Sequence, residues 1–468
     1  MKTKKILSLV ISALSLASVV GCGGNNGTSN NNSSNTTGNT DDKVITIWVG
    51  AESVQFYSEK VEEYKTKYAQ EKGETFPCTF SVKGVDTGTA ADVWLQDPEV
   101  GADIFTIAHD NIAKLVAGNC PIMPITDQEL LTQVNEMNPD SFLDVIKGTY
   151  KETEFSFAVP YISQALVLFY NKQYVTAEQA KTWEGLREAA EAASAQVGKT
   201  VQAGSFLGTD GYNFSWPVLA RKVSDNSTTV KIYEGGVQDN CYFQGDDTVS
   251  IVKWTQDYFK SENGAKFPSS AGWEVELQNT VSLSVIGGAW SYKAAKAALG
   301  SNLAITTLPK FTITKDSAYG NSTEGTQYQS GTFVDCKAFV MKRASKCAAY
   351  LQDVVKYLTT IEMQEQSFEA CQNLPAYKNA ATEFEAMTGD TLEAQLAAAQ
   401  VNMAQYGIPQ PFGYKEKFNT YYYSKGAPEK LKAAIENVDG SYSSLEVIKA
   451  ECQNIEHIWR KGKEIAAA

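Results

Sequence analysis

The chain has 468 residues, with 54 Asp and Glu against 41 Lys and Arg, and a formal net charge of −13 at pH 7. This excess of acid argues against nucleic acid and against an anionic membrane surface as partners, and it suits a protein that binds neutral ligands. The part of the chain beyond residue 42 is too long for one hydrophobic core, so two domains or lobes are expected.

The N-terminal residues have the pattern of an export signal. Residues 1–21 begin with lysines and continue with the apolar run 6–20, which is too short to span a bilayer. The run ends in "VVGC", which resembles a bacterial lipobox. The resemblance implies cleavage before Cys22 and a lipid on its sulfur. The alternative is an ordinary secretory signal that an incidental cysteine follows.

Residues 22–42 are expected to be a lipidated cysteine and a tether. The segment 23–42 consists of Gly, Asn, Ser, Thr and Asp, so it has no apolar side chain to bury and is predicted to be disordered. A lipid at Cys22 would hold the protein at the extracellular face of the cell membrane without spanning it. No later stretch approaches about 18 consecutive apolar residues, so no membrane-spanning helix is expected.

Strands and helices alternate over the first third of the remaining chain. Period-2 or continuous apolar runs predict strands, and apolar residues at helical spacing predict helices. The expected strands are 43–50, 78–85 and 102–108, and the expected helices are 56–73, 89–97 and 111–117, with Gly73 ending the first of them. This alternation favours a parallel α/β sheet.

The alternation continues in the second third, and the C-terminal part is predominantly helical. The expected strands are 164–172, 281–290, 303–309 and 331–341, and Thr182 is the expected N-cap of a helix over 182–196. The terminal segment places Ile448, Cys452, Ile455 and Trp459 on one helical face, which is typical of core packing.

His109 and Asp110 form the histidine–acid pair that most invites a catalytic interpretation. Asp110 follows a predicted strand and precedes a predicted helix, so it is expected to be an N-cap and also to lie where open α/β sheets bind ligands. Neither a G-x-S-x-G nor an H-E-x-x-H motif accompanies the pair, so no nucleophile, metal or cofactor is expected. His109 is interpreted as a structural hydrogen-bonding residue.

The eight cysteines show no C-x-x-C spacing, which argues against a zinc site or a redox motif. Spacing alone does not show whether any of them pair. Most are interpreted as free, semi-buried small hydrophobic residues.

Seven segments of the chain form a recognisable set, and in chain order they are "IWVGAE" (47–52), "GADIFTIAHDNIAKLVAGN" (101–119), "AVPYISQALVLFYNK" (158–172), "KTWEGL" (181–186), "YNFSWPVLA" (212–220), "GGAWS" (287–291) and "YGIPQP" (406–411). Together they resemble the maltose/maltodextrin-binding proteins, within family 1 of the extracellular solute-binding proteins of ABC importers. Each alone would be weak, but they occur in the family's order and spacing.

The resemblance implies a periplasmic-binding-protein fold, in which two α/β lobes enclose a hinged ligand cleft. It divides the chain into an N-terminal lobe of 43–162 plus 311–373 and a C-terminal lobe of 163–310 plus 374–468. The implied function is binding of a maltodextrin-like oligosaccharide and its delivery to ABC permease subunits. The protein would be a monomer without enzymatic activity and would need no cofactor.

The resemblance also implies site residues. Trp290 matches a tryptophan that stacks on sugar rings, and Asp110 and Glu52 match acids that bond sugar hydroxyls. The remaining expected ligand residues are those where this chain departs from the family's side chains, and they are Asn111, Gln164, Asn213 and Tyr414. These departures favour a carbohydrate other than maltose.

Some alternatives remain open at this point. Trp290 could be a core tryptophan, and Glu52 could be a solvated loop acid. Glu52 and Asp110 could also serve as the two carboxylates of a surface-anchored glycoside hydrolase. The remaining alternatives for the whole protein are a solute-binding protein for a non-sugar ligand and an adhesive surface lipoprotein.

Overall fold

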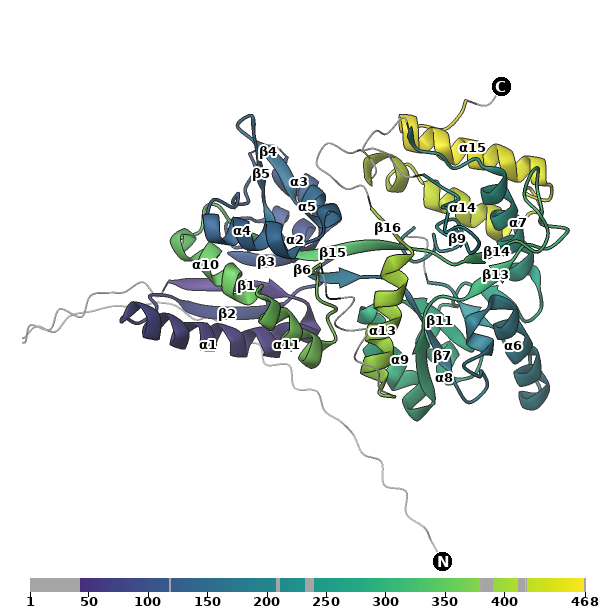
Figure 1. The fold of residues 1–468 in the computed structure, drawn as a ribbon, viewed down its shortest axis with the longest axis horizontal. Coiled ribbons are helices and arrows are strands. Elements are labelled where there is room, and N and C mark those ends of the chain that lie inside the picture. Colours follow the sequence, from purple (N-terminus) through teal and green to yellow (C-terminus); the bar gives the residue numbers. More distant parts are fainter. Residues whose placement is uncertain are drawn as a thin grey trace, which may run out of the picture. The chain divides into compact units, whose positions relative to one another are not determined.

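The structure is a computed structural model that describes residues 43–117, 119–207, 211–231, 240–378, 380, 390–410, 417 and 419–466 (Figure 1). The predicted signal, Cys22 and the predicted tether therefore lie outside the described residues. Within the described ranges, no helix is both long enough and apolar enough to cross a membrane.

The first sheet has the strand order β16-β15-β3-β1-β2, and β6 also pairs with β15. Its strands are β1 (Val44–Val49), β2 (Thr79–Gly84), β3 (Ile104–Ala108), β6 (Ala158–Gln164), β15 (Thr332–Met341) and β16 (Gly407–Pro409). The expected parallel pairing is found between β1 and its neighbours β2 and β3, but β15 runs antiparallel to β3 and β6. The prediction of a parallel sheet is therefore wrong for β15. The chain forms the second lobe between β6 and β15, so no single βαβ crossover fixes the direction of β15.

Helices cover the first sheet, and a small hairpin lies beside it (Figure 1). The helices are α1 (Val54–Lys72), α2 (Ala90–Gln96), α3 (Ile112–Val116), α4 (Gln128–Met137), α5 (Asp140–Val145), α10 (Ala348–Leu358) and α11 (Ile361–Cys371), and the hairpin pairs β4 (Lys147–Tyr150) with β5 (Thr153–Ser156). Gly73 ends α1 as predicted, with φ 72°, and its N–H donates to the carbonyl of Ala69. A glycine adopts this left-handed conformation without a Cβ clash.

The second sheet has the strand order β10-β8-β11-β7-β12, with β7 antiparallel to both β11 and β12. Its strands are β7 (Val167–Asn171), β8 (Gly204–Ser205), β10 (Ala265–Lys266), β11 (Ser284–Gly287) and β12 (Leu303–Thr306). A smaller antiparallel sheet joins β9 (Arg221–Lys222), β13 (Lys310–Thr312) and β14 (Gln327–Gln329).

The helices of the second part are α6 (Trp183–Val197), α7 (Asp246–Lys260), α8 (Trp273–Gln278), α9 (Tyr292–Leu299), α13 (Leu392–Gln405), α14 (Ala427–Glu436) and α15 (Leu445–Lys461). Thr182 caps α6 as predicted, because its side-chain oxygen accepts from the N–H of Gly185 at 3.0 Å. The predicted stripe of α15 is confirmed as core, since Ile448, Cys452 and Trp459 are all buried among α7 and α14. Such amphipathic burial stabilises a helix more than its intrinsic propensity does.

Two large hydrophobic cores define the two α/β lobes. The core of the first lobe draws on residues between 45 and 162 and between 336 and 376. The main core of the second lobe draws on residues between 165 and 328 and between 396 and 403. Phe311, Ile313 and Tyr328 belong to this second core, which argues against the predicted return to the first lobe at residue 311. On this packing we propose that the chain returns near residue 330 and enters the first lobe along β15.

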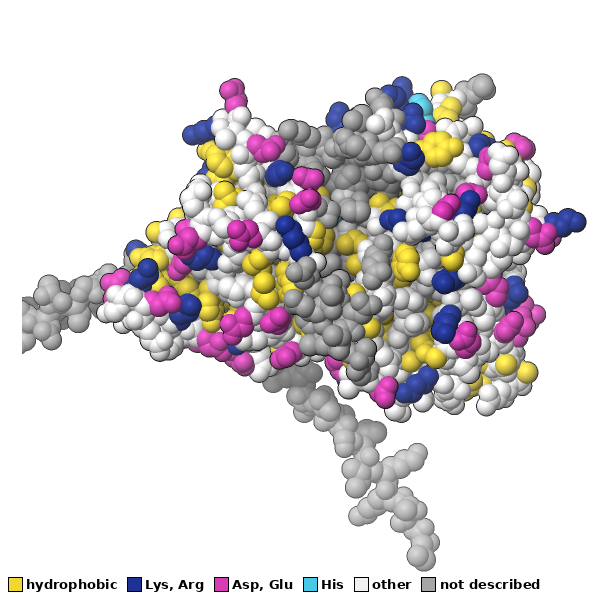
Figure 2. Space-filling view, viewed as in Figure 1, with side chains coloured by type: hydrophobic (Ala, Val, Ile, Leu, Met, Phe, Trp, Pro, Cys, Tyr) yellow, Lys and Arg dark blue, Asp and Glu magenta, His cyan; other side chains and the backbone are white. Residues whose placement is uncertain are grey.

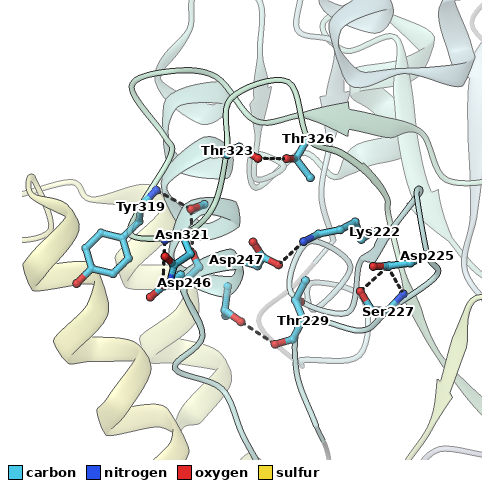
Figure 3. Close-up of polar contacts among 12 residues, drawn as sticks. Lys222, Asp225, Ser227, Thr229, Asp246, Asp247, Tyr319, Asn321, Thr323 and Thr326 are labelled. Carbon is cyan, nitrogen blue, oxygen red and sulfur yellow. Dashed lines mark hydrogen bonds and ion pairs between the residues drawn. The ribbon is translucent and has the colours of Figure 1, made fainter.

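Polar contacts hold the segment around residues 319–326 against the start of α7 (Figure 3). The N–H of Tyr319 donates to the side-chain oxygen of Ser250 at 2.9 Å, and the N–H of Asn321 donates to Oδ2 of Asp246 at 3.1 Å. These bonds are made within the second lobe. They support the proposal that the chain stays in that lobe beyond residue 311.

The surface of the described residues carries both signs of charge. In the view of Figure 2, lysine and arginine side chains are interspersed with aspartate and glutamate side chains over the visible face. A face of this kind favours solubility and offers no basic patch for a polyanion.

Candidate functional site

The structure contains a cavity of about 510 Å³ that residues of both lobes enclose. We call it the cleft pocket. Its lining residues are Asp86, Thr87, Gly88, Ala108, Asp110, Gln164, Tyr212, Asn213, Trp290, Asp335, Lys337, Gln410 and Tyr423. The volume lies in the range of about 300–1,000 Å³ that is typical of small-molecule sites. The pocket therefore has room for a ligand larger than a single ion or water.

Asp110 lies in a short 3-10 turn, His109–Asn111, between β3 and α3. The prediction that Asp110 caps α3 is wrong: the N-cap of α3 is Asn111, and its side chain makes no capping bond. Asn111 is buried and does not line the pocket, but its Nδ2 donates to Oδ1 of Asp110 at 2.8 Å. The 3-10 turn thus places the Asp110 carboxyl in the pocket, and Asn111 orients it.

Asp335 and Lys337 enter the pocket from β15, where their spacing of two puts both side chains on the same face of the strand. Gln164, at the end of β6, lies opposite Asp335 in the pairing of the two strands. With its amide oriented to satisfy both neighbours, Gln164 donates to Oδ1 of Asp335 at 3.3 Å and accepts from Nζ of Lys337 at 3.2 Å. The hydroxyl of Tyr212 donates to Oδ1 of Asp335 at 3.5 Å. The four side chains form one polar network on the pocket wall.

Burial changes the ionisation of the two acids. It raises the pKa of Asp110 to about 6. It raises the pKa of Asp335 further, to about 7, with a smaller contribution from the charge of Asp110, and the charge of Lys337 opposes the rise. Two carboxyls that share a poorly solvated site resist being ionised together. Near neutral pH the pocket therefore offers both carboxylate acceptors and a carboxyl that is still partly protonated.

His109 is buried behind these acids. Its Nδ1 lies 4.0 Å from Oδ2 of Asp335, and burial lowers the pKa of the imidazole to about 4. The ring is therefore neutral at physiological pH. His109 does not line the pocket, so the His109–Asp110 pair is not presented to a ligand as a catalytic pair.

Trp290 forms an aromatic part of the wall, in the 3-10 turn Ala289–Ser291 that follows β11. It is 43% exposed, which excludes the alternative of a core tryptophan. A Cβ on Gly288 would lie only 2.0 Å from Cζ3 of Trp290, so glycine is what allows the ring to lie over the backbone there. The Tyr212 ring centroid is 5.9 Å from that of Trp290, and Nζ of Lys337 is 6.0 Å from the Trp290 ring.

The structure brings together only some of the residues that the sequence predicts for the site. Asp110, Gln164, Asn213 and Trp290 line the cleft pocket, and Tyr414 lies outside the described residues. Glu52 is exposed in the turn Ala51–Ser53 and does not line the pocket. The pair of carboxylates that a hydrolase was expected to use, Glu52 and Asp110, is therefore not assembled in this pocket.

The other lining residues were missed, and they are Asp86, Thr87, Gly88, Ala108, Tyr212, Asp335, Lys337, Gln410 and Tyr423. For Asp335 and Lys337 a signal was present, since "VDCK" places two charges inside an otherwise apolar strand. A charge buried in a strand needs partners, so it marks a functional or paired site. Gln410 lies in the segment "YGIPQP", but nothing in that segment singled it out as a ligand residue. Tyr423 gave no signal, and the two residues meet only in the fold, where the Tyr423 hydroxyl donates to Oε1 of Gln410 at 2.8 Å.

The groups that line the pocket are able to make hydrogen bonds and aromatic contacts. Among the described residues, no group of three or more His, Cys, Asp and Glu side chains is placed to hold a metal ion. The lining combines carboxyl, amide, hydroxyl and ammonium groups with the faces of Trp290 and Tyr212.

Solved structures with a similar fold include the maltodextrin-binding protein MalE1 from L. casei BL23 without ligand, at 19% identity and a TM-score of 0.65, with 90% of this chain and 99% of that chain covered. A structure solved with acarbose has 18% identity, a TM-score of 0.67 and the same coverage. The GacH receptor of Streptomyces glaucescens, solved unliganded and in complex with acarbose, has 16% identity and a TM-score of 0.62, with 90% and 100% covered. These likenesses show that the chain has the periplasmic-binding-protein fold.

A sequence comparison with curated proteins finds no match. The family model described as bacterial extracellular solute-binding protein matches residues 63–398, which is well over half of the chain and includes elements of both lobes. The chain therefore belongs to the bacterial extracellular solute-binding proteins.

Proposed function

We propose that the protein binds an oligosaccharide in the cleft pocket and delivers it to the permease subunits of an ABC importer. The observation that carries this proposal is the combination of a half-exposed tryptophan with carboxyl and amide groups in one cavity between two lobes. Aromatic faces suit the C–H surfaces of sugar rings, and carboxylates and amides suit their hydroxyls. Family membership supports solute binding. The structural similarity to a maltodextrin-binding protein and to a receptor solved in complex with acarbose supports a sugar as the ligand.

The proposed contacts are assigned by position. Trp290 stacks on a sugar ring, with Tyr212 extending the aromatic wall. Asp110 and Asp335 accept hydrogen bonds from hydroxyls, and Asp335 also donates one while it is protonated. Gln164 and Asn213 supply amide groups that donate as well as accept.

The remaining parts of the proposal concern location and motion. The protein is held at the extracellular face of the membrane by a lipid on Cys22, and it acts as a monomer. The lobes close on the ligand by a hinge motion of the strands that cross between them, β6 and β15. Closing would surround the ligand and present one bound conformation to the permease. Turnover of the ligand is not part of this function.

A second candidate ligand class is an amine-bearing solute such as an amino sugar. The observation that favours it is the charge of the pocket, because the described lining residues include Asp86, Asp110 and Asp335 against the single cation Lys337. A protonated amine would compensate the acids that burial leaves poorly solvated. A neutral sugar would instead leave Asp335 partly protonated.

The experiment that tests both candidates is a thermal-shift screen of the full chain against neutral oligosaccharides, amino sugars and small amines. A ligand that binds only the folded state raises apparent stability by RT ln(1 + [L]/Kd), which is about 2.7 kcal/mol at one hundred times Kd. Stabilisation by neutral glycans supports the leading proposal, and stabilisation confined to amines supports the second. Product analysis of the same mixtures tests for hydrolysis, and sugar cleavage would contradict a pure binding role. No stabilisation by any compound would contradict both candidates.

A further inference from the structure

Cys78 and Cys347 lie against each other in the core of the first lobe. Their sulfur atoms are 3.2 Å apart, although the two residues are separated by 269 positions in the sequence. Cys78 directly precedes β2, and Cys347 is the N-cap residue of α10. Both are almost fully buried, at 3% and 1% exposure. A disulfide has a sulfur–sulfur bond of about 2.0 Å, so a closure of roughly 1.2 Å would join them.

We propose that Cys78 and Cys347 are a disulfide-forming pair that staples the two chain segments of the first lobe together. The first lobe consists of a segment before the second lobe and a segment after it, so its integrity otherwise depends on non-covalent packing. Cys78 belongs to the earlier segment and Cys347 to the later one. The bond would close the chain around the entire inserted second lobe. This inference does not depend on which ligand the cleft pocket binds.

The compartment suits the reaction, because members of this family act outside the cytoplasm, where disulfides persist. The bond forms by two exchange steps with a disulfide of the thiol-oxidoreductase or glutathione class. One cysteine thiolate attacks that disulfide, giving a mixed disulfide and releasing one thiol. The second cysteine then attacks the mixed disulfide, which forms the Cys78–Cys347 bond and releases the second thiol. The two protein thiols are oxidised, and the partner disulfide is reduced to two thiols.

The surroundings of the pair determine when this exchange occurs. The ring centroid of Phe76 lies 5.4 Å from those of both Phe80 and Tyr350, and Phe76 belongs to the same hydrophobic core as the two cysteines. Burial raises the pKa of the Cys78 thiol to about 12, so the native protein holds little of the thiolate that attacks disulfides. Thiol–disulfide exchange at these cysteines is therefore fast only before the first lobe has folded. Once formed, the bond is shielded from reductants in the same way.

The other described cysteines provide matched controls. Cys120 is buried in the same core, and its sulfur donates to the carbonyl of Ile122 at 3.6 Å, with no sulfur–sulfur contact found for it among the described residues. A Cys120→Ala substitution removes a similar buried thiol without removing a pairing partner. It separates the loss of packing from the loss of a crosslink.

The decisive experiment is peptide mapping of the full chain after refolding with either oxidised or reduced glutathione, followed by alkylation of free thiols in denaturant. After oxidised refolding, we expect the Cys78 and Cys347 peptides to be joined and Cys120 to be alkylated. After reduced refolding, we expect all three to be alkylated. The oxidised form should have a Tm higher by on the order of 5–10 °C, because closing a long loop restricts the unfolded chain. Alkylation of both Cys78 and Cys347 after oxidised refolding would overturn the proposal.

A double-mutant cycle gives an independent measurement. In oxidised protein, Cys78→Ala and Cys347→Ala should each lower Tm, and the double variant should be little worse than either single variant, because one substitution already removes the bond. Cys120→Ala should lower Tm equally in oxidised and reduced protein. Additive effects of the two substitutions, equal under both conditions, would mean that the thiols only pack. If a variant does not fold, the mapping of the wild-type chain still decides.

Discussion

Replacing Asp335 by asparagine should stabilise the protein at alkaline pH and leave its stability unchanged at acid pH. Burial, followed by the charge of Asp110, raises the pKa of Asp335 from 3.8 to about 7 in the folded protein. Well below pH 3.8 the carboxyl is protonated in both the folded and the unfolded chain, so it has no effect on their balance. As the pH rises towards 7, the unfolded chain releases the proton first, and the free energy of unfolding falls.

The size of the effect follows from the same pKa. Each pKa unit corresponds to about 1.4 kcal/mol, so ionisation of Asp335 lowers the free energy of unfolding by about 4 kcal/mol above pH 7. Relaxation of the pocket will reduce it, and we expect Asp335→Asn to raise the free energy of unfolding by about 2–4 kcal/mol at pH 8. At pH 4.5 the gain should fall below about 1 kcal/mol. The same substitution should weaken ligand binding, because the pocket loses a carboxylate acceptor.

The assay is urea unfolding of wild type and variant at pH 4.5, 6 and 8 without ligand. Asp316→Asn is the matched control, since Asp316 is an exposed acid between β13 and β14 and does not line the pocket. It should change stability by less than about 0.5 kcal/mol at every pH. If Asp335→Asn stabilises equally at pH 4.5 and pH 8, or destabilises at pH 8, the burial argument for this carboxyl is wrong.

Three further predictions follow from the proposed function. Trp290→Ala should raise the ligand Kd about ten-fold or more, because it removes a stacking contact of about 1–3 kcal/mol, and it should cost little stability because the residue is 43% exposed. Tyr242→Ala is the control, since Tyr242 is 39% exposed and lies outside the pocket. A large drop in Tm with unchanged Kd in the Trp290 variant would refute the stacking role. Cys22→Ser should release the protein from the membrane fraction, and undiminished membrane retention would contradict the lipid anchor. X-ray scattering with saturating ligand should give a smaller radius of gyration than without it, and an equal radius would count against hinge closure of an open cleft.

Local features of the fold could be predicted from the sequence because neighbouring residues determine them. Gly73 ends α1 and Thr182 caps α6 through contacts within one helical turn, and the stripe of α15 follows from helical periodicity. The direction of β15 and the point of return to the first lobe could not be predicted in this way. Both depend on pairings between residues that are far apart in the sequence, such as Asp335 with Gln164. The short strand β13, with Phe311 as its one apolar residue, fits either lobe until its partners, β14 and the core around Tyr328, are known.

Sequence motifs likewise predict only some of the residues that line the cleft pocket, and the fold brings the others to it. The segments that resemble the sugar-binding family supply seven lining residues to the cleft pocket, and they are Ala108, Asp110, Gln164, Tyr212, Asn213, Trp290 and Gln410. These segments mark the part of the wall that the common scaffold provides. Asp335 and Lys337 lie in none of those segments, yet they bring a buried carboxyl and a half-buried ammonium to the pocket and contact Gln164 from the crossing strand. Because a buried charge discriminates strongly between partners that satisfy it and those that do not, β15 is where we expect the ligand preference of this chain to be determined. Exchanging these two residues for neutral ones should therefore change which solute binds, while substitutions in the scaffold segments should change how tightly any solute binds.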